Sequence, residues 1–174
     1  MGLAAAFKEF APNLHDFYSH HMHQLLERDD GLKFPFPKSV FACVAFNFGP
    51  QVVAIPHKDH INLAYGWCSI TALGNFNHKN GGHLVLPELK LVIEFPAGST
   101  VLIPSAALTH YNLPIGPGET RRSITHFSAG GLFRWISYGY QLKGAALATG
   151  VEGQQWWEKG EGLYAKMWPC RNTE

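Results

Sequence analysis

The stretch GGHLVLPELKLVIEFPAGSTVLIP, residues 81 to 104, alternates short apolar runs with turn-forming residues. The runs HLVL, LKLVIEF and TVLIP contain many valine, isoleucine and phenylalanine residues, which strands favour. Proline and glycine separate the runs, and both residues favour tight turns. The stretch therefore predicts short strands in succession, each followed by a reversal of the chain.

The same pattern of short apolar runs between turn residues continues on both sides of this stretch. Other strand-like runs are VFACVAFNF (40–48), VVAI (52–55), WCSITAL (67–73) and RRSITHF (121–127). At least seven or eight strands are expected between residues 40 and 127, and no helix-length pattern interrupts them. This arrangement favours an antiparallel barrel or sandwich.

Helical spacing appears before the strands and is expected again after them. Pro12 and Gly31 bracket an amphipathic helix predicted over residues 13 to 28. The segment EGQQWWEKGEGLYAKMW (152–168) is expected to form one or two further helices. The apolar face of the first helix comprises Leu14, Phe17, Tyr18, His21, Met22, Leu25 and Leu26.

Composition narrows the class of protein. A chain of 174 residues with 46% hydrophobic residues is long enough for one domain with a core. No apolar run reaches the ~20 residues of a membrane span.

Net charge is +1 and lysine and arginine form no run, so charge gives no positive evidence for nucleic-acid binding. Cys43, Cys68 and Cys170 are odd in number and contain no CxxC pair, which favours an intracellular compartment over a disulfide scaffold.

A cluster of titratable residues interrupts the apolar texture in AIPHKDHINLAYGW, residues 54 to 67. His57 and Asp59 lie two positions apart at the expected end of a strand, so their side chains share a face and Lys58 points to the other. His110 closes a later strand-like run, LTHYNLP. These residues are either unrelated turn and core residues or the ligands of a metal.

Two adjacent arginines follow the last of these residues. Arg121 shares one face of its expected strand with Ser123 and Thr125, and Arg122 points to the other face. Both arginines could be solvated strand-end charges. The Arg-x-Ser pattern favours Arg121 as the one that faces inward.

Two imidazoles and one carboxylate form the ligand set that holds non-haem Fe(II) on one side and leaves three adjacent positions free. Two of those positions can chelate a 2-oxo acid, and the third can receive dioxygen. An inward arginine can then bind the far carboxylate of that acid through a two-pronged charge-assisted bond. Zinc or manganese in a non-redox site, and iron in a cupin-type oxygenase without a 2-oxo acid, are the alternatives that Arg121 disfavours.

These motifs resemble the Fe(II)/2-oxoglutarate-dependent oxygenases, whose core is a double-stranded β-helix, also called a jelly roll. Within that superfamily, FNFGP (46–50), the run from PHKDH to SAALTH (56–110) and RRSITHFSAGGLFRW (121–135) resemble the compact fungal TET/JBP-like oxygenases. The resemblance covers about residues 40 to 142.

The resemblance implies a mostly β jelly roll with an N-terminal helix and short C-terminal helices. It implies a single oxygenase domain over residues 1–174, with a helical part at 1–38, the β-helix core at 40–142 and an extension at 143–174. The implied iron ligands, which would also be the catalytic centre, are His57, Asp59 and His110.

The implied cofactors are Fe(II), 2-oxoglutarate and dioxygen. Arg121 would bind the far carboxylate of 2-oxoglutarate and Ser123 would assist it. Asn47 in FNFGP is a candidate to reach the 2-oxo acid or a metal-bound water, or else to cap a strand end.

The implied substrate is 5-methylcytosine or another methylated nucleobase in DNA or RNA, which would make the protein nuclear. Unlike the larger TET enzymes, the chain has no cysteine-rich zinc-binding region and no strongly basic flank. Hydroxylation of a small metabolite or peptide, and a non-catalytic binding module on the same fold, remain alternatives. Candidate substrate-binding residues in the segments NLAYGW and NFNHKN are Asn62, Tyr65, Trp67 and His78.

Overall fold

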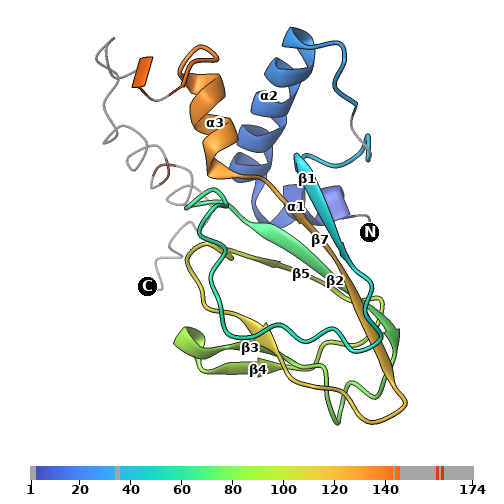
Figure 1. Cartoon of the computed structure of the whole chain (residues 1–174). Helices are drawn as coiled ribbons and strands as arrows, with labels where there is room; N and C mark the ends of the chain where they lie inside the picture. The colour runs from blue at the N-terminus through green and yellow to red at the C-terminus, as the bar shows by residue number, and fades with distance from the viewer. Residues whose placement is uncertain (1–2, 34–35, 143, 146–159, 161, 163–174) are drawn as a thin grey trace, which may run out of the picture. The chain divides into compact units, whose positions relative to one another are not determined.

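The computed structural model describes residues 3–33, 36–142, 144–145, 160 and 162 (Figure 1). The chain divides into two compact units, one of Met1–Ala42 with Gly131–Glu174 and one of Cys43–Gly130. A single oxygenase domain over 1–174 stays a prediction. Most of the C-terminal segment 152–168, where further helices were predicted, lies outside the described residues.

The first unit is helical. The predicted helix at 13–28 is confirmed as α2, Pro12–Arg28, and five residues of its expected apolar face are buried. Helix α1, Leu3–Phe10, precedes it. Helix α3, Gly130–Ser137, falls within the range 40–142 predicted as the β-helix core, so that range contains a helix near its end.

Tertiary packing explains why α3 was not predicted. Its sequence GGLFRWIS begins with two glycines, which are poor helix formers. Phe133 of α3 is nevertheless fully buried, stacked on Phe17 with 5.3 Å between ring centroids and tilted against Tyr18 at 5.0 Å. Burial of three aromatic rings therefore outweighs the low helix propensity of the segment.

The second unit consists of two antiparallel sheets. The first has the order β1-β7-β2-β5 and the second has the order β4-β3-β6. The strands are β1 Cys43–Asn47, β2 Cys68–Asn75, β3 Leu84–Leu86, β4 Leu91–Ile93, β5 Thr100–Ile103, β6 Tyr111–Asn112 and β7 Thr120–Phe127.

This strand order is that of a jelly roll. The segment between β1 and β2 forms isolated bridges instead of a regular strand, with Gln51 paired to Arg121 and His57 paired to His110. If this segment is counted as a strand beside β6, the two sheets contain the eight strands of a jelly roll. The predicted mostly β, antiparallel fold is confirmed.

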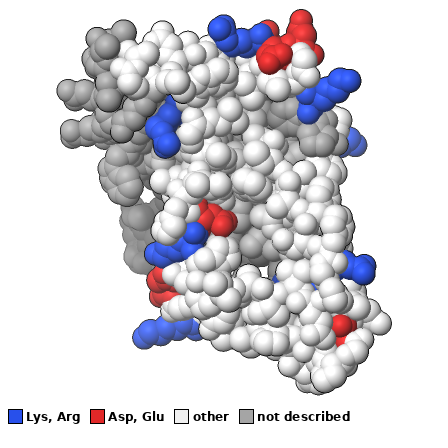
Figure 2. All heavy atoms as spheres, in the orientation of Figure 1, with Lys and Arg blue, Asp and Glu red and all other residues white. Residues whose placement is uncertain are grey.

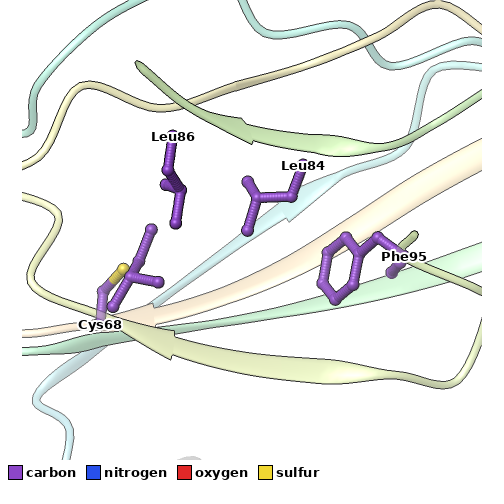
Figure 3. Packing of buried hydrophobic residues seen from close by; sticks show 6 residues of the cluster. Cys68, Leu84, Leu86 and Phe95 are labelled. Atoms are coloured by element: carbon purple, nitrogen blue, oxygen red, sulfur yellow. The ribbon is translucent and has the colours of Figure 1, made fainter. Parts of the chain in front are cut away.

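The core of this unit lies between its two sheets. Leu84 and Leu86 of β3 pack against Cys68 of β2 and against Phe95 (Figure 3). Ala72 and Ile103 complete this buried cluster. Along β2, the alternate residues Cys68, Ile70 and Ala72 face this cluster, because successive side chains of a strand point to opposite faces.

Two turns determine how the strands meet. The predicted GGHLVLPEL hairpin is confirmed: β3 leads through a 3₁₀ turn, η1 (Pro87–Leu89), and through Lys90 in the left-handed conformation into β4. At Gly74, φ is +122° and a Cβ atom would meet the carbonyl oxygen of Thr120, so only glycine allows β2 and β7 to approach there.

No helix in the described part of the chain combines the length and the apolar character that a membrane crossing requires.

Candidate metal centre

A cavity of about 430 Å³ lies in the jelly-roll unit and is lined by residues of both sheets. One group of its lining residues is apolar, and it includes Ile70, Leu84 and Phe95. The other group is polar and includes His57, Asp59, His110, Arg121, Ser123 and Asn47. Asn62 also lines the cavity, so seven candidate residues from the sequence are brought together there.

His57, Asp59 and His110 form a compact cluster, in which one potential ligand atom of each residue lies within 4.8 Å of the others. The Asp59 carboxylate lies 3.6 Å from His57 Nε2 and 3.9 Å from His110 Nε2. The two imidazole rings are 4.3 Å apart between centroids. The three side chains therefore converge from one side, as in a facial metal site.

Backbone carbonyls fix the orientation of both imidazoles. His57 Nδ1 lies 2.7 Å from the carbonyl oxygen of Ile55, and His110 Nδ1 lies 3.1 Å from that of Leu108. A carbonyl can only accept, so Nδ1 carries the proton in each ring and Nε2 keeps a free lone pair. Both Nε2 atoms are thereby prepared to bind a cation.

The carboxylate of Asp59 is oriented in a similar way. Asn62 donates from Nδ2 to Asp59 Oδ2 at 3.1 Å and to Ser105 Oγ at 3.1 Å. The backbone N–H of Asp59 donates to the carbonyl oxygen of Ser105 at 2.9 Å. Asn62 was predicted to bind substrate, and the structure places it beside Asp59 as a hydrogen-bond partner.

Burial favours the metal-binding form of His110. The residue is 4% exposed, and desolvation lowers the pKa of its imidazole below the ordinary value despite the neighbouring Asp59 carboxylate. A neutral imidazole is the form that ligates metals.

The segment that carries His57 and Asp59 is not the strand that the run VVAI predicted, and that expectation was wrong. The side chain of Asn112 accepts the N–H of Ala54 at 2.8 Å and donates to the carbonyl oxygen of Val52 at 3.1 Å. An amide side chain thus replaces a neighbouring strand as the hydrogen-bond partner. Asn112 carried no pattern that distinguished it in the sequence.

A charged contact outside the cavity connects the two ligand-bearing segments. The Glu88 carboxylate accepts hydrogen bonds from Thr109 Oγ1 at 2.6 Å and from the Thr109 N–H at 3.1 Å. It also lies 3.3 Å from Lys58 Nζ. Lys58 stands between His57 and Asp59, and it points away from the cavity as predicted.

Arg121 occupies the same cavity as the metal cluster. Its residue is 3% exposed, whereas Arg122 is exposed, as the alternation along β7 predicted. Arg121 Nη1 donates to the carbonyl oxygen of Val52 at 3.3 Å, and its buried Nε has no hydrogen-bond partner. Burial lowers the pKa of Arg121, but guanidinium is so basic that it stays charged.

Ser123 and Asn47 lie beside this arginine on paired positions of β7 and β1. Asn47 Nδ2 donates to Ser123 Oγ at 3.0 Å, and both residues line the cavity. Three hydrogen-bonding side chains that line the cavity, Arg121, Ser123 and Asn47, are therefore available to an anion.

The remaining sequence candidates lie elsewhere. Tyr65, Trp67 and His78 are not among the residues that line the cavity. His78 instead forms an ion pair with Glu94, with 3.4 Å between Nε2 and Oε2. Their assignment to substrate binding stays a prediction without support from the cavity.

The donors fit both groups that the sequence motifs imply. Two oriented imidazoles and a carboxylate match the preferences of Fe(II), and they leave the cavity side of a bound ion open. A buried guanidinium N–H without a hydrogen-bond partner costs free energy unless an acceptor pairs with it. A carboxylate would supply such an acceptor.

Comparison with known proteins gives matches among solved structures only. No family model and no curated protein matches the chain. NgTET1 in complex with 5mC DNA is 17% identical over 64% of this chain and 47% of that one, with a TM-score of 0.47. The viral collagen prolyl hydroxylase of Paramecium Bursaria Chlorella virus-1, as its 2OG complex, is 16% identical over 62% and 68%, with a TM-score of 0.36. The chain spans about half the length of NgTET1.

Glu88 makes the stability of the folded chain depend on pH. Hydrogen bonds from Thr109 lower the pKa of Glu88 from 4.5 to about 2. Because the folded-state pKa is depressed, the stabilisation is complete above about pH 4.5 and is lost as the pH falls toward about 2. The difference in free energy of unfolding between the native protein and Glu88→Gln, measured in urea, should be constant above this window and should shrink within it. A difference that does not change with pH would contradict this account.

Proposed function

We propose that this protein is an Fe(II)- and 2-oxoglutarate-dependent dioxygenase that oxidises a substrate C–H bond. The proposal is carried by one observation: a His–Asp–His cluster and a buried arginine with an unpaired N–H line the same cavity. A purely structural zinc site is closed by four protein ligands, whereas this cluster offers three and faces a cavity.

His57, Asp59 and His110 are the proposed iron ligands. Ile55 and Leu108 hold the Nδ1 protons, so both rings present Nε2 to the metal. The carboxylate of Asp59 offsets part of the charge of the dication, which lowers the cost of burying it.

Arg121 is the proposed anchor for the far carboxylate of 2-oxoglutarate. The unpaired Nε supplies a charge-assisted hydrogen bond that the folded chain leaves unused. Ser123, linked to Asn47, places a hydroxyl beside the guanidinium and assists it. The anchor determines the orientation of the co-substrate, so that its 2-oxo group faces the metal cluster.

Iron with 2-oxoglutarate and dioxygen supplies the oxidant: the substrate C–H becomes C–OH, and 2-oxoglutarate becomes succinate and carbon dioxide. The chain contributes orientation and a cavity with apolar walls. Ile70, Leu84 and Phe95 offer no easily oxidised thiol or thioether to the reacting centre.

The charged side chains of the cavity limit which substrate groups can enter it. Among the described residues that line the cavity, Asp59 and Arg121 are the only ones, apart from the histidines, whose side chains carry a full charge, and the proposal assigns both of them. A charged group entering the cavity would then find no partner. The group that is oxidised is therefore uncharged, as is the methyl group of a methylated base.

A methylated nucleobase, with 5-methylcytosine as the first example, is the substrate that we propose for testing. The base would have to leave its stack to reach the cavity. Figure 2 shows lysine and arginine as separate spots on the face in view, not as a continuous patch. Binding to DNA or RNA should accordingly be modest and strongly weakened by salt. Nuclear location belongs to this version of the proposal, and intracellular location to every version.

The metal assignment predicts the behaviour of single-residue variants. His57→Ala, Asp59→Ala and His110→Ala should each abolish 2-oxoglutarate turnover, because three ligands are needed to hold iron on one face. Succinate formation and iron content should be measured together. His20→Ala, at an exposed position of α2 that is not part of the cavity lining, serves as the control and should retain turnover. Full turnover in a triad variant that still binds iron would remove that ligand from the assignment.

The two adjacent arginines should differ in their effect on the co-substrate. Arg121→Gln should raise the 2-oxoglutarate concentration for half-maximal turnover by about tenfold to a hundredfold, since a hydrogen bond to a charged group contributes ~1.5–3 kcal/mol. Arg122→Gln, with its exposed side chain, should change it little. Equal effects, or the reverse order, would show that Arg121 does not bind the acid.

The identity of the substrate can be tested by measuring whether its oxidation is coupled to 2-oxoglutarate turnover. Protein with Fe(II) and 2-oxoglutarate should be given methylated single-stranded and duplex oligonucleotides, unmethylated controls, and uncharged small molecules and peptides. A substrate should raise succinate formation and give a product heavier by one oxygen atom in mass spectrometry. If methylated oligonucleotides give no product while 2-oxoglutarate is consumed, the nucleobase proposal is wrong and a small-molecule or peptide hydroxylase takes its place. Binding of neutral ligands without any turnover of 2-oxoglutarate would instead indicate a non-catalytic module.

A further inference from the structure

We infer that Glu88 is a positioning residue that sets the distance between the two ligand-bearing segments, although it lies outside the cavity. The inference rests on the proposed metal site, and it concerns a residue in the turn η1 between β3 and β4. Its hydrogen bonds and ion pair are with Thr109 and Lys58, and not with any of the three ligands.

The segments have little regular structure to hold them in place. His57 and His110 form an isolated antiparallel bridge, in which the His110 N–H donates to the His57 carbonyl oxygen at 3.0 Å and the reverse bond measures 3.3 Å. No regular strand extends through residues 52–60. A sheet therefore does not fix the register of His57 and Asp59 as it does for Arg121 on β7.

Glu88 supplies a fixed point for both segments at once. Thr109, immediately before His110, donates to Glu88 through its hydroxyl and through its backbone N–H. Lys58, between His57 and Asp59, pairs with the same carboxylate at 3.3 Å. Because neighbouring residues in an extended chain point in opposite directions, holding Thr109 and Lys58 outside directs the three ligands inward.

The network combines two kinds of contact. An exposed ion pair by itself contributes little, so the Lys58 contact alone would be a weak constraint. The bidentate bonds to Thr109 use both donors of one residue and are charge-assisted, which makes their geometry specific. Glu88 therefore acts mainly on the position of His110 and, through Lys58, more weakly on His57 and Asp59.

Affinity for Co(II), measured by titration and by the visible absorption of the bound ion, tests this role without requiring turnover. Glu88→Gln keeps the shape but lacks the charge, and Glu88→Ala lacks both. We expect the dissociation constant of Co(II) to rise by about tenfold in Glu88→Ala and by less in Glu88→Gln, because partners that orient ligands typically change metal affinity by 10- to 100-fold. Thr109→Val retains only the N–H donor. Its dissociation constant for Co(II) should lie between those of Glu88→Gln and the native protein.

Glu94→Gln is the matched control. This glutamate follows β4, near the same hairpin, and its ion pair is with His78. It should leave Co(II) affinity and the absorption spectrum unchanged. The free energy of unfolding of each metal-free variant should be measured as well, at a temperature where all of them are folded.

The outcomes are distinct. Reduced stability with native Co(II) affinity in both Glu88 variants would overturn the inference and leave Glu88 a structural residue only. If Glu88→Ala fails to fold, Glu88→Gln and Thr109→Val decide the question by the same criterion. Native Co(II) affinity in His57→Ala or His110→Ala would instead overturn the proposed metal site, independently of Glu88.

Discussion

The pair of hydrogen bonds between the backbones of His57 and His110 is the interaction on which the rest of the site depends. It places two imidazoles with 4.3 Å between ring centroids, although the residues are far apart in the chain. It also closes the jelly roll, because this bridge takes the place of a strand beside β6. The hydrogen bonds that close the fold therefore also bring together the two histidines of the proposed ligand set.

Around that bridge, side chains form hydrogen bonds in place of those that a neighbouring strand would form. Asn112 satisfies the backbone of Val52 and Ala54, Asn62 connects Asp59 to Ser105, and Glu88 holds the outer side. A loop held by side chains can follow a path that a pleated strand cannot. It can therefore present His57 and Asp59 to the cavity and leave space for a ligand next to them.

The two groups of polar side chains in the cavity are held by different means. Arg121 and Ser123 lie on β7, which pairs with both β1 and β2, so a well-paired central strand fixes the proposed anchor for an anion. His57 and Asp59 of the proposed metal centre lie on a segment without regular strand structure. The proposed anchor for the co-substrate and the proposed metal ligands can therefore vary independently, and substitutions in the loops should alter metal affinity more than anion affinity.

The sequence by itself determined the antiparallel β fold, and it singled out residues that the structure brings to one cavity. Alternating runs between turns indicated antiparallel strands, and period two along β7 separated Arg121 from Arg122 correctly, because a strand directs alternate side chains to opposite faces. Only the tertiary structure decided that the VVAI segment is not a strand and that GGLFRWIS is a helix. In both places long-range partners, Asn112 for the first and the ring of Phe17 for the second, outweigh local propensity. The contacts of Glu88 likewise could not be predicted from the sequence, because Lys58 and Thr109 meet its carboxylate only in the folded chain.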